Sequence, residues 1–242
     1  EVATVEWEKK YKKYEDYVQP RITSVNVNLD LFPEKRDFKA SGSYLMVNKS
    51  DEAIDSLFLD HSSRISTFKF DKPNDLVSED TVYHFDIYQF KDPILPGDTI
   101  QLTFTVKNKN NTLLRNNSPV LYNGTFINNS VFPSIGYPGG ELRDDKTREK
   151  YGLLPNNLKP FPSDSTALGN TYISRDADWI DFEAIVSTSK DQIAISPGYL
   201  QREWIKEDRR YFHYKMDSKI LNFYAFNSAN YLVKKDKWKN VD

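Results

Sequence analysis

The N-terminal segment carries apolar residues at the spacing of a helix. Large apolar side chains recur at intervals of four and three residues: Trp7, Tyr11, Tyr14 and Val18. This spacing places them on one helical face, and charged residues fill the other faces. Pro20 predicts that the helix ends at or before Gln19. We therefore predict a helix in residues 1–19, either a connector from an upstream segment or an amphipathic helix packed on its own domain.

From Arg21 onward the apolar positions alternate, as they do in a strand with one buried face. The alternating residues, with one slip near Thr23, are Ile22, Val25, Val27, Leu29 and Leu31. This pattern predicts a half-buried antiparallel strand. Further strands are predicted at residues 38–50, 54–60, 64–71, 81–88 and 98–106. Turn sequences separate them: a charged turn begins at Pro33, and Pro-Gly-Asp at residues 96–98 predicts a type II turn.

The chain then becomes irregular before strands return. Residues 107–177 form this central excursion, which is rich in Asn and includes a predicted short helix at residues 143–152 that ends at a glycine. Strands are predicted again at residues 179–188, 192–196, 198–204, 209–216, 221–229 and 230–238. No repeat of fixed period divides the chain. We therefore predict a mainly β protein, with a single β domain over residues 20–242 built as a sandwich or an open saddle-shaped sheet.

The composition indicates a folded protein with an aromatic interior. The 242 residues include 15 Tyr and 15 Phe, and the net charge is −2. That balance gives the chain as a whole no basis for binding nucleic acid or a membrane surface. No apolar run approaches the roughly 20 residues that span a bilayer. Cysteine is absent, which excludes disulfides and thiolate metal sites.

Residues that carry hydrolytic or metal chemistry are scarce. Histidine occurs at only three positions: His61, His84 and His213. The zinc-peptidase pattern H-E-x-x-H, which needs two His one helical turn apart, does not occur in the sequence. Neither G-x-S-x-G, nor a P-loop, nor G-x-G-x-x-G occurs. We therefore predict that this chain forms no catalytic or metal site by itself, and a stand-alone hydrolase with a novel site conflicts with this scarcity.

The central excursion holds candidates for binding. N-x-S/T sequons, in a number that an Asn-rich chain produces by chance, occur at Asn48, Asn110, Asn116, Asn123 and Asn128. The Asn cluster has two explanations. Its side chains can satisfy irregular backbone, or they can form a substrate-facing loop, because a neutral amide both donates and accepts hydrogen bonds with peptide or sugar groups.

The order of segments resembles a known arrangement. The relevant stretches are ILPGDTIQLTFTV, YNGTFINNSVFPSIGY, WIDFEAIVSTSKDQIAISPGYLQREW and RRYFHYKMDSKILNFYAFNSANY. In this order they resemble the N-terminal domain of aminopeptidase N-type (gluzincin) zinc metallopeptidases, and most closely the bacterial branch fused to a transporter permease. FPSIGY with the following ELRDD is the most specific part. In that branch, EWEKKYKKYEDYVQPRI is similar to the segment that links the membrane part to the peptidase part.

The resemblance implies a saddle-shaped antiparallel β-sandwich, with an N-terminal helix and one short central helix, that packs against a catalytic domain and helps to form its peptide cleft. That catalytic domain carries H-E-x-x-H and G-x-M-E-N, neither of which occurs here. We therefore expect a non-catalytic N-terminal domain that is inactive alone and holds no cofactor, with zinc in a missing catalytic domain of the same polypeptide. The implied parent is a zinc metallo-aminopeptidase with peptide substrates and no nucleic-acid partner. Its membrane contact is expected only through an upstream permease, and its location is expected to be extracytoplasmic.

The resemblance also implies site residues. In this family a polar residue in the loop before the F-P motif helps to hold the substrate amine. The matching candidates here are Asn128 and Asn129, with Asn123 as a weaker third. The acidic pair of the usual F-P-x-x-D-E-P pattern is replaced by Gly136 and Tyr137. Because an amide offers only a dipole to an ammonium group, we expect weaker selection of free amines than an acid would give.

A second interpretation of the function stays open. A stand-alone extracytoplasmic β-sandwich module could bind glycan or protein through exposed aromatic side chains. This interpretation predicts a row of such side chains on one face, for which the candidates are Trp179, Trp204 and Trp238.

Overall fold

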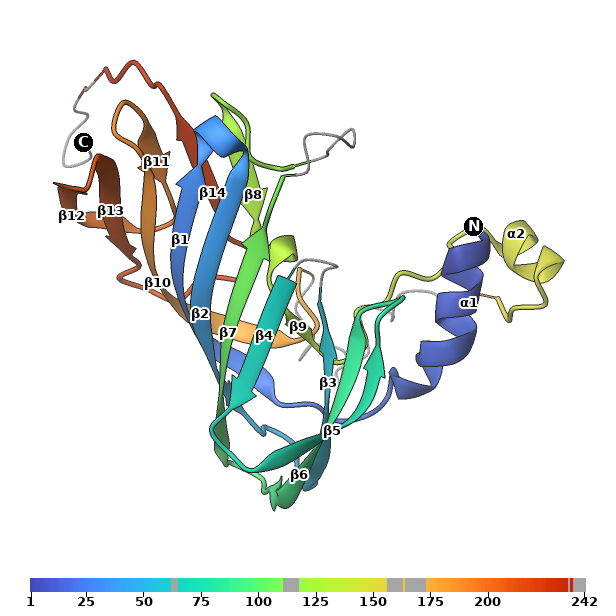
Figure 1. The fold of residues 1–242 in the computed structure, drawn as a ribbon. Helices are drawn as coiled ribbons and strands as arrows, with labels where there is room; N and C mark the ends of the chain where they lie inside the picture. Colours follow the sequence, from blue (N-terminus) through green and yellow to red (C-terminus); the bar gives the residue numbers. More distant parts are fainter. Residues whose placement is uncertain (62–64, 111–117, 156–162, 164–172, 235, 237–242) are drawn as a thin grey trace.

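Three β-sheets organise the chain (Figure 1). The computed structural model describes residues 1–61, 65–110, 118–155, 163, 173–234 and 236. The largest sheet has seven strands in the order β12-β13-β10-β1-β2-β7-β4. Their bounds are β1 (Arg21–Phe32), β2 (Asp37–Val47), β4 (Ile65–Phe70), β7 (Thr99–Asn108), β10 (Ala177–Ser189), β12 (Tyr199–Lys206) and β13 (Arg209–Lys215).

Two smaller sheets complete the layered architecture. A four-stranded sheet has the order β5 (Asn74–Asp80), β6 (Phe85–Ile94), β3 (Ile54–Asp60) and β9 (Ser134–Ile135). A three-stranded sheet has the order β11 (Ile193–Ile195), β14 (Ala225–Ala229) and β8 (Thr125–Asn128). Buried side chains of all three sheets, such as Val27, Leu57 and Phe226, form one hydrophobic cluster. The predicted fold class, mainly β with layered antiparallel sheets and an N-terminal helix, is confirmed.

Strand β1 lies at the centre of the large sheet. The slip in its alternation near Thr23 is a bulge, where the pairing with β2 shifts register between Ile22 and Ser24. Strand β1 runs antiparallel to β2 but parallel to β10. The prediction of an antiparallel strand is therefore wrong on one side. Strand β7, which is antiparallel to β2, also runs in the direction of β10. The chain therefore needs a long crossover connection between β7 and β10, and the central excursion is that connection.

Two other strand predictions need correction. In the strand predicted at 81–88, residues 81–84 instead form the hairpin turn between β5 and β6, with His84 at a φ of 58°. The sequence pattern does not reveal β5, because β5 is an edge strand whose side chains are largely exposed and lack alternation. In the strand predicted at 230–238, residues 230–234 form no strand, and beyond them the structure describes only residue 236.

The helices agree with the sequence pattern. Helix α1 (Val2–Tyr11) and the 3-10 turn η1 (Lys12–Tyr14) end before the predicted limit at Gln19. Helix α2 (Asp145–Lys150) occupies the predicted short helix. Asp144 accepts a hydrogen bond from the Thr147 N–H at 2.8 Å, and Gly152 ends the helix with a φ of 66°. Among the described helices, none has the length and apolar character needed to cross a membrane.

The turns also follow their residues. The turn η2 (Pro33–Lys35) joins β1 to β2, and Arg36 closes it in the left-handed region. Gly97 has a φ of 84°, and the Asp98 N–H donates to the Leu95 carbonyl at 2.9 Å. These features confirm the predicted type II turn before β7.

Gly42 in β2 generates a stability prediction. A Cβ at this position would lie 2.5 Å from Cζ of Phe104 and 2.7 Å from the Asn26 carbonyl oxygen. Since the Asn26 atom belongs to the backbone of the neighbouring strand, the sheet has to distort to accept the methyl group. Gly42→Ala is expected to lower the free energy of unfolding by about 1–3 kcal/mol in urea titrations. Ser43→Ala, on the opposite face, is expected to change it by less than about 0.5 kcal/mol; equal effects would contradict the close approach.

Candidate binding site

A cavity of about 540 Å³ lies beside the FPSIGY segment. Its lining comes from β2, β3, the 129–138 segment, residues 173–176 and residue 222: Tyr44, Asp60, His61, Asn129, Ser130, Phe132, Pro133, Ser134, Ile135, Tyr137, Pro138, Ile173, Ser174, Arg175, Asp176 and Asn222. The cavity therefore joins the first half of the chain to the second and has the recognised motif along one side.

The FPSIGY segment is held between two sheets. Its residues Ser134 and Ile135 form β9, which pairs with Asp60 and Leu59 of β3. At the other end of the segment, the ring of Phe132 lies in the main core, 5.8 Å from the ring of Phe104. The motif is therefore fixed by sheet pairing on one side and by aromatic packing on the other.

The three predicted Asn residues lie in different places. Asn128 caps the 3-10 turn η3 (Asn129–Val131): its Oδ1 accepts from the Ser130 N–H at 3.1 Å. The Asn129 side chain lines the cavity and donates from Nδ2 to the Asn222 carbonyl at 2.9 Å. Asn123 does not line the cavity; its Oδ1 accepts from the Asn230 N–H at 2.8 Å. The structure thus brings Asn129 to the cavity, with Asn128 positioning its turn, and the proposed contact of these Asn with substrate stays a prediction.

Two carboxylates that the sequence analysis did not select as site residues line the same cavity. Asp60 ends β3 and accepts from Ser134 Oγ at 3.3 Å. Asp176 precedes β10 and accepts from the Ile135 N–H at 3.1 Å and from Asn222 Nδ2 at 3.3 Å. Burial raises the pKa of Asp60 from 3.8 to about 6. No motif links the two residues, because pairing of β9 with β3 and of β10 with β1 is what brings them to one cavity.

The carboxylates of the lining suit a ligand that donates hydrogen bonds and carries positive charge, and the one arginine of the lining, Arg175, is paired with Glu15 at 3.1 Å. Asp60 and Asp176 provide acceptor oxygens, and the Asn129 amide and Ser130 hydroxyl can add neutral contacts. His61, also in the lining, lies 3.2 Å from Asp86. In the described part of the chain, no group of three His, Cys, Asp or Glu residues is placed to hold a metal ion. The residues present therefore fit an organic cation and do not fit zinc.

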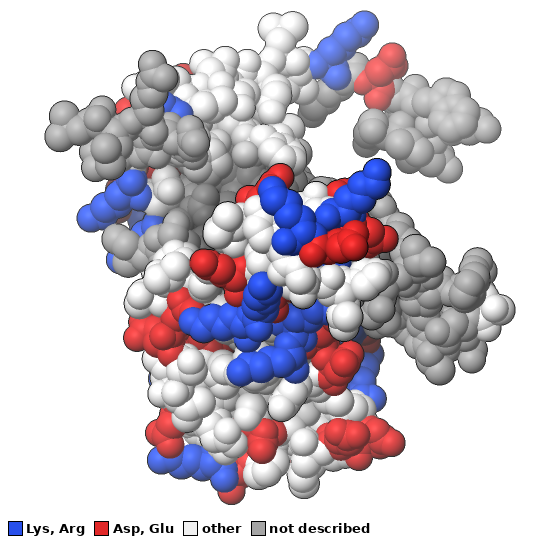
Figure 2. All heavy atoms as spheres, turned by 90° about the vertical axis from the view of Figure 1, so that its right-hand side faces the viewer, with Lys and Arg blue, Asp and Glu red and all other residues white. Residues whose placement is uncertain are grey.

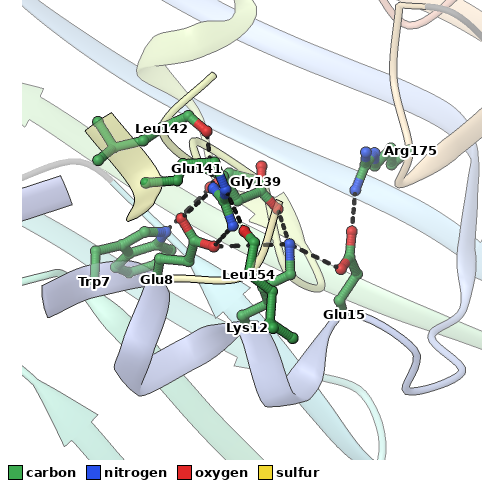
Figure 3. A network of polar contacts seen from close by, with 10 residues as sticks. Trp7, Glu8, Lys12, Glu15, Gly139, Glu141, Leu142, Leu154 and Arg175 are labelled. Carbon is green, nitrogen blue, oxygen red and sulfur yellow. Dashed lines mark hydrogen bonds and ion pairs between the residues drawn. The ribbon is translucent and has the colours of Figure 1, made fainter. Parts of the chain in front are cut away.

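Helix α1 and the residues just after it contact one wall of the cavity, and Figure 3 draws one of these contacts, from Glu15 to Arg175. Trp7 Nε1 donates to the Gly139 carbonyl at 3.1 Å, and its ring stacks on Tyr137 at 6.1 Å. Glu15, just after η1, accepts from Arg175 at 3.1 Å. Both Tyr137 and Arg175 line the cavity, so the position of α1 determines where this wall stands. Of the two roles predicted for the helix, packing on its own domain is therefore observed. The role of a connector from an upstream segment stays a prediction.

A buried ion pair fixes α1 to α2. The two nitrogens of the Arg148 guanidinium donate to the two carboxylate oxygens of Glu8 at 2.6 and 3.0 Å. The side chains are only 1% and 2% exposed. Arg148 also donates to the carbonyls of Leu142 and Leu154, at 2.8 and 2.6 Å. This bidentate geometry locks the segment that follows FPSIGY onto α1. Figure 3 labels the partners of Arg148, which are Glu8, Leu142 and Leu154.

The aromatic row of the alternative interpretation is not continuous in the large sheet. Trp204 of β12 stacks on Tyr211 of β13 at 5.2 Å, and Tyr211 pairs with Ser187 of β10. Trp179 is 56% exposed but lies eight residues before Ser187 on β10, roughly 25 Å away along the strand. Trp238 lies outside the described residues.

Comparison with known proteins identifies the fold. No protein-family model and no curated protein matches this sequence. Among solved structures, the M1 zinc metallopeptidase of Deinococcus radiodurans matches with a TM-score of 0.52 and 11% identity over 86% of this chain. A mutant of that enzyme bound to a Tyr-Ser-Ala substrate matches with a TM-score of 0.51 and 12% identity. A two-domain M1 zinc metallopeptidase mutant bound to L-arginine matches with a TM-score of 0.51 and 11% identity.

The match shows a shared fold with part of these enzymes. The chain spans 42% of the length of each of these solved structures. The fold implied by the sequence resemblance, that of an M1 peptidase N-terminal domain, is therefore supported at the level of architecture.

The buried Glu8–Arg148 pair generates a second stability prediction. Glu8→Gln leaves the guanidinium of Arg148 buried without a carboxylate, so we expect a loss of about 3–5 kcal/mol in the free energy of unfolding, measured in urea. Glu8→Leu combined with Arg148→Met should lose much less, because no charge stays buried. Glu149→Gln, an exposed change on α2, is the matched control. A single-variant loss no larger than that of the control would contradict this account of the pair.

The raised pKa of Asp60 generates a pH prediction. The folded state holds this proton more tightly than the unfolded state, so its contribution to stability is complete below about pH 4 and is lost as the pH rises to about 6. Asn does not titrate, so the free energy of unfolding of Asp60→Asn does not fall over this pH range on account of residue 60. The free energy of unfolding of the variant minus that of the wild type should therefore grow by about 1–3 kcal/mol between pH 4 and pH 6.5. A difference that stays constant over this range would show that Asp60 titrates normally.

Proposed function

We propose that this chain is the non-catalytic N-terminal domain of a zinc aminopeptidase-like protein. It packs against a catalytic domain of the same polypeptide and forms one wall of the cleft that holds the peptide substrate. The observation that carries the proposal is the cavity at the FPSIGY segment, with Asn129, Asp60 and Asp176 in its lining. The shared fold with a two-domain M1 zinc metallopeptidase and with an M1 zinc metallopeptidase bound to a Tyr-Ser-Ala substrate supports it.

An exposed apolar surface beside the cavity supports packing against a second domain. On the outer face of the three-stranded sheet, Phe126 and Ile195 lie on either side of Asn227. Phe126 and Ile195 are 53% and 42% exposed. Phe223, two residues before the start of β14, is 53% exposed. Groups of exposed large apolar side chains mark interaction surfaces. The strand β8 that carries Phe126 continues into Asn129 of the cavity, so a domain seated on this surface would also face the cavity.

The proposed task of the cavity is to hold the amino terminus of a peptide. The usual acidic pair of the motif is absent, but Asp60 and Asp176 bring carboxylates to the same place from other segments. A carboxylate attracts an ammonium group more strongly than the Asn129 amide does. The chemistry of bond cleavage is proposed to belong to the catalytic domain, where zinc is expected, because the described residues of this chain do not fit a metal site.

The sequence resemblance extends the proposal beyond this domain. In the transporter-fused branch, the segment that includes α1 follows a permease, so we propose an extracytoplasmic domain whose membrane contact is made by that upstream part. On this view α1 has two tasks. It links the domain to the permease, and its contacts with Tyr137 and Arg175 support the cavity wall.

The kinetics of the full-length protein test the proposal. Asn129→Ala should raise the KM for a peptide with a free amino terminus about 3–10-fold and leave kcat within about twofold, because it removes a contact made equally in the ground and transition states. Asn128→Ala should raise KM in the same direction by loosening the turn η3. Asn123→Ala, whose side chain lies away from the cavity, is the control.

Two results would overturn the proposal. One is full-length protein that hydrolyses no peptide and binds no zinc. The other is a KM that is the same in the wild type, Asn129→Ala and Asp60→Asn, with all three folded to the same extent by urea titration.

A further inference from the structure

The large sheet has a polar face on the side opposite the core. The register of β1, β2, β7 and β4 places exposed or half-buried polar residues directly opposite one another in two rows. The first row is Asn26, Ser43, Thr103 and Lys69, and the second is Asn28, Ser41, Thr105 and Thr67. The four strands lie side by side in Figure 1, so the rows form one continuous surface of hydroxyl and amide groups.

A third row adds positive charge. Lys39 of β2 lies directly opposite Lys107 of β7, an arrangement of like charges that disfavours folding unless something offsets it. Exposed Lys109 follows Lys107 beyond the end of β7. Within the part of the chain that the structure describes, no ion pair involves these three lysines or Lys69.

The nearest carboxylates have other partners. Asp30 lies opposite Lys39 on β1, but its Oδ1 accepts from Ser187 Oγ at 2.5 Å. Asp37 accepts from the Asn110 N–H at 2.5 Å. On the side of the molecule shown in Figure 2, by contrast, basic and acidic side chains are interleaved. Elements α1 and β5, which lie on that side in Figure 1, are joined by the Lys10–Asp80 ion pair.

The polar face is hollowed along its length. A cavity of about 460 Å³ is lined by all eight residues of the first two rows. A smaller cavity of about 190 Å³ is lined by four lysines and one carboxylate, together with Asn108, Phe32 and Phe38: Lys35, Lys39, Lys107, Lys109 and Asp37. Because the three rows are consecutive in the register, the neutral hollow leads directly to the basic one. An extended ligand can therefore occupy both.

We propose that this face binds a linear acidic polysaccharide. The Ser, Thr and Asn side chains donate and accept hydrogen bonds, as sugar hydroxyls require. The lysines provide the charge that carboxylates of such a chain need. The three rows contain no aromatic side chain, and the two phenylalanines that also line the larger cavity, Phe68 and Phe104, alternate with the row residues and pack on the core side. The rows therefore lack the stacking platform on which single-stranded nucleic acid binding depends. The first two rows also lack the apolar side chains that insert into a membrane interface. This inference is independent of the proposed peptidase role, which uses the opposite side of the sheet.

Calorimetric titration of the chain with polygalacturonate oligomers tests the inference. Lys39→Gln combined with Lys107→Gln should weaken binding about tenfold at low salt. Ser41→Val combined with Thr105→Val keeps every charge and suits a strand, and should weaken binding at high salt at least about threefold. Lys13→Gln combined with Lys146→Gln removes the same charge from exposed positions on the α1 and α2 side and should change the affinity less than about twofold. Urea titration of each variant confirms that it is folded.

Four outcomes would overturn the inference. Wild-type protein could show no binding at low salt, or the control double variant could lose as much affinity as the Lys39 and Lys107 variant. The Ser41 and Thr105 variant could bind as tightly as the wild type, which would leave only charge. Duplex DNA or anionic phospholipid vesicles could bind as tightly as polygalacturonate, which would exclude selection for carbohydrate.

Discussion

The parallel pairing of β1 with β10 is the constraint on which the rest of the architecture depends. It joins β1, β2, β7 and β4 to β10, β13 and β12 within one sheet. Strand β7 runs in the same direction as β10, with β1 and β2 between them, so the chain must cross over from β7 to β10. That crossover contains β8, η3, β9 and α2, and with them most of the FPSIGY cavity. The mixed sheet therefore requires the irregular central segment, and this segment provides most of the residues that line the cavity.

A crossover of this kind has to satisfy its backbone without long strands. Side-chain amides and carboxylates do much of this: Asn128 caps η3, Asn129 bonds the Asn222 carbonyl, and Asp176 accepts from the Ile135 N–H. The Glu8–Arg148 pair then fixes the far end of the segment to α1. A buried ion pair contributes little net stability against apolar residues of the same size, but it tolerates only one arrangement of its partners. Here that arrangement sets the distance between α1 and the cavity wall.

Alternation in sequence predicts the strands that have one buried face, such as β1 and β7, and its slip near Thr23 coincides with the bulge in the structure. It fails where burial does not alternate: β5 is an exposed edge, and β9 is only two residues long. It also cannot show pairing. Asp60 and Asp176 look like ordinary strand ends, because only the register of β9 against β3 and of β10 against β1 brings them together. The family resemblance led to Asn129 through motif position, without any knowledge of the cavity.

The two proposed ligand surfaces lie on opposite sides of the same sheet, and each depends on a different property of it. The peptidase cleft needs irregular segments that can deliver scattered carboxylates to one point, and these occur only where the crossover meets the smaller sheets. The polysaccharide face needs regular spacing, which β1, β2, β7 and β4 provide through an unbroken register over both rows. Since Val27, Phe104 and their neighbours fill the core between these surfaces, neither can change its spacing without the other. On both proposals together, a domain anchored to an acidic polymer would hold its peptide cleft facing away from that polymer.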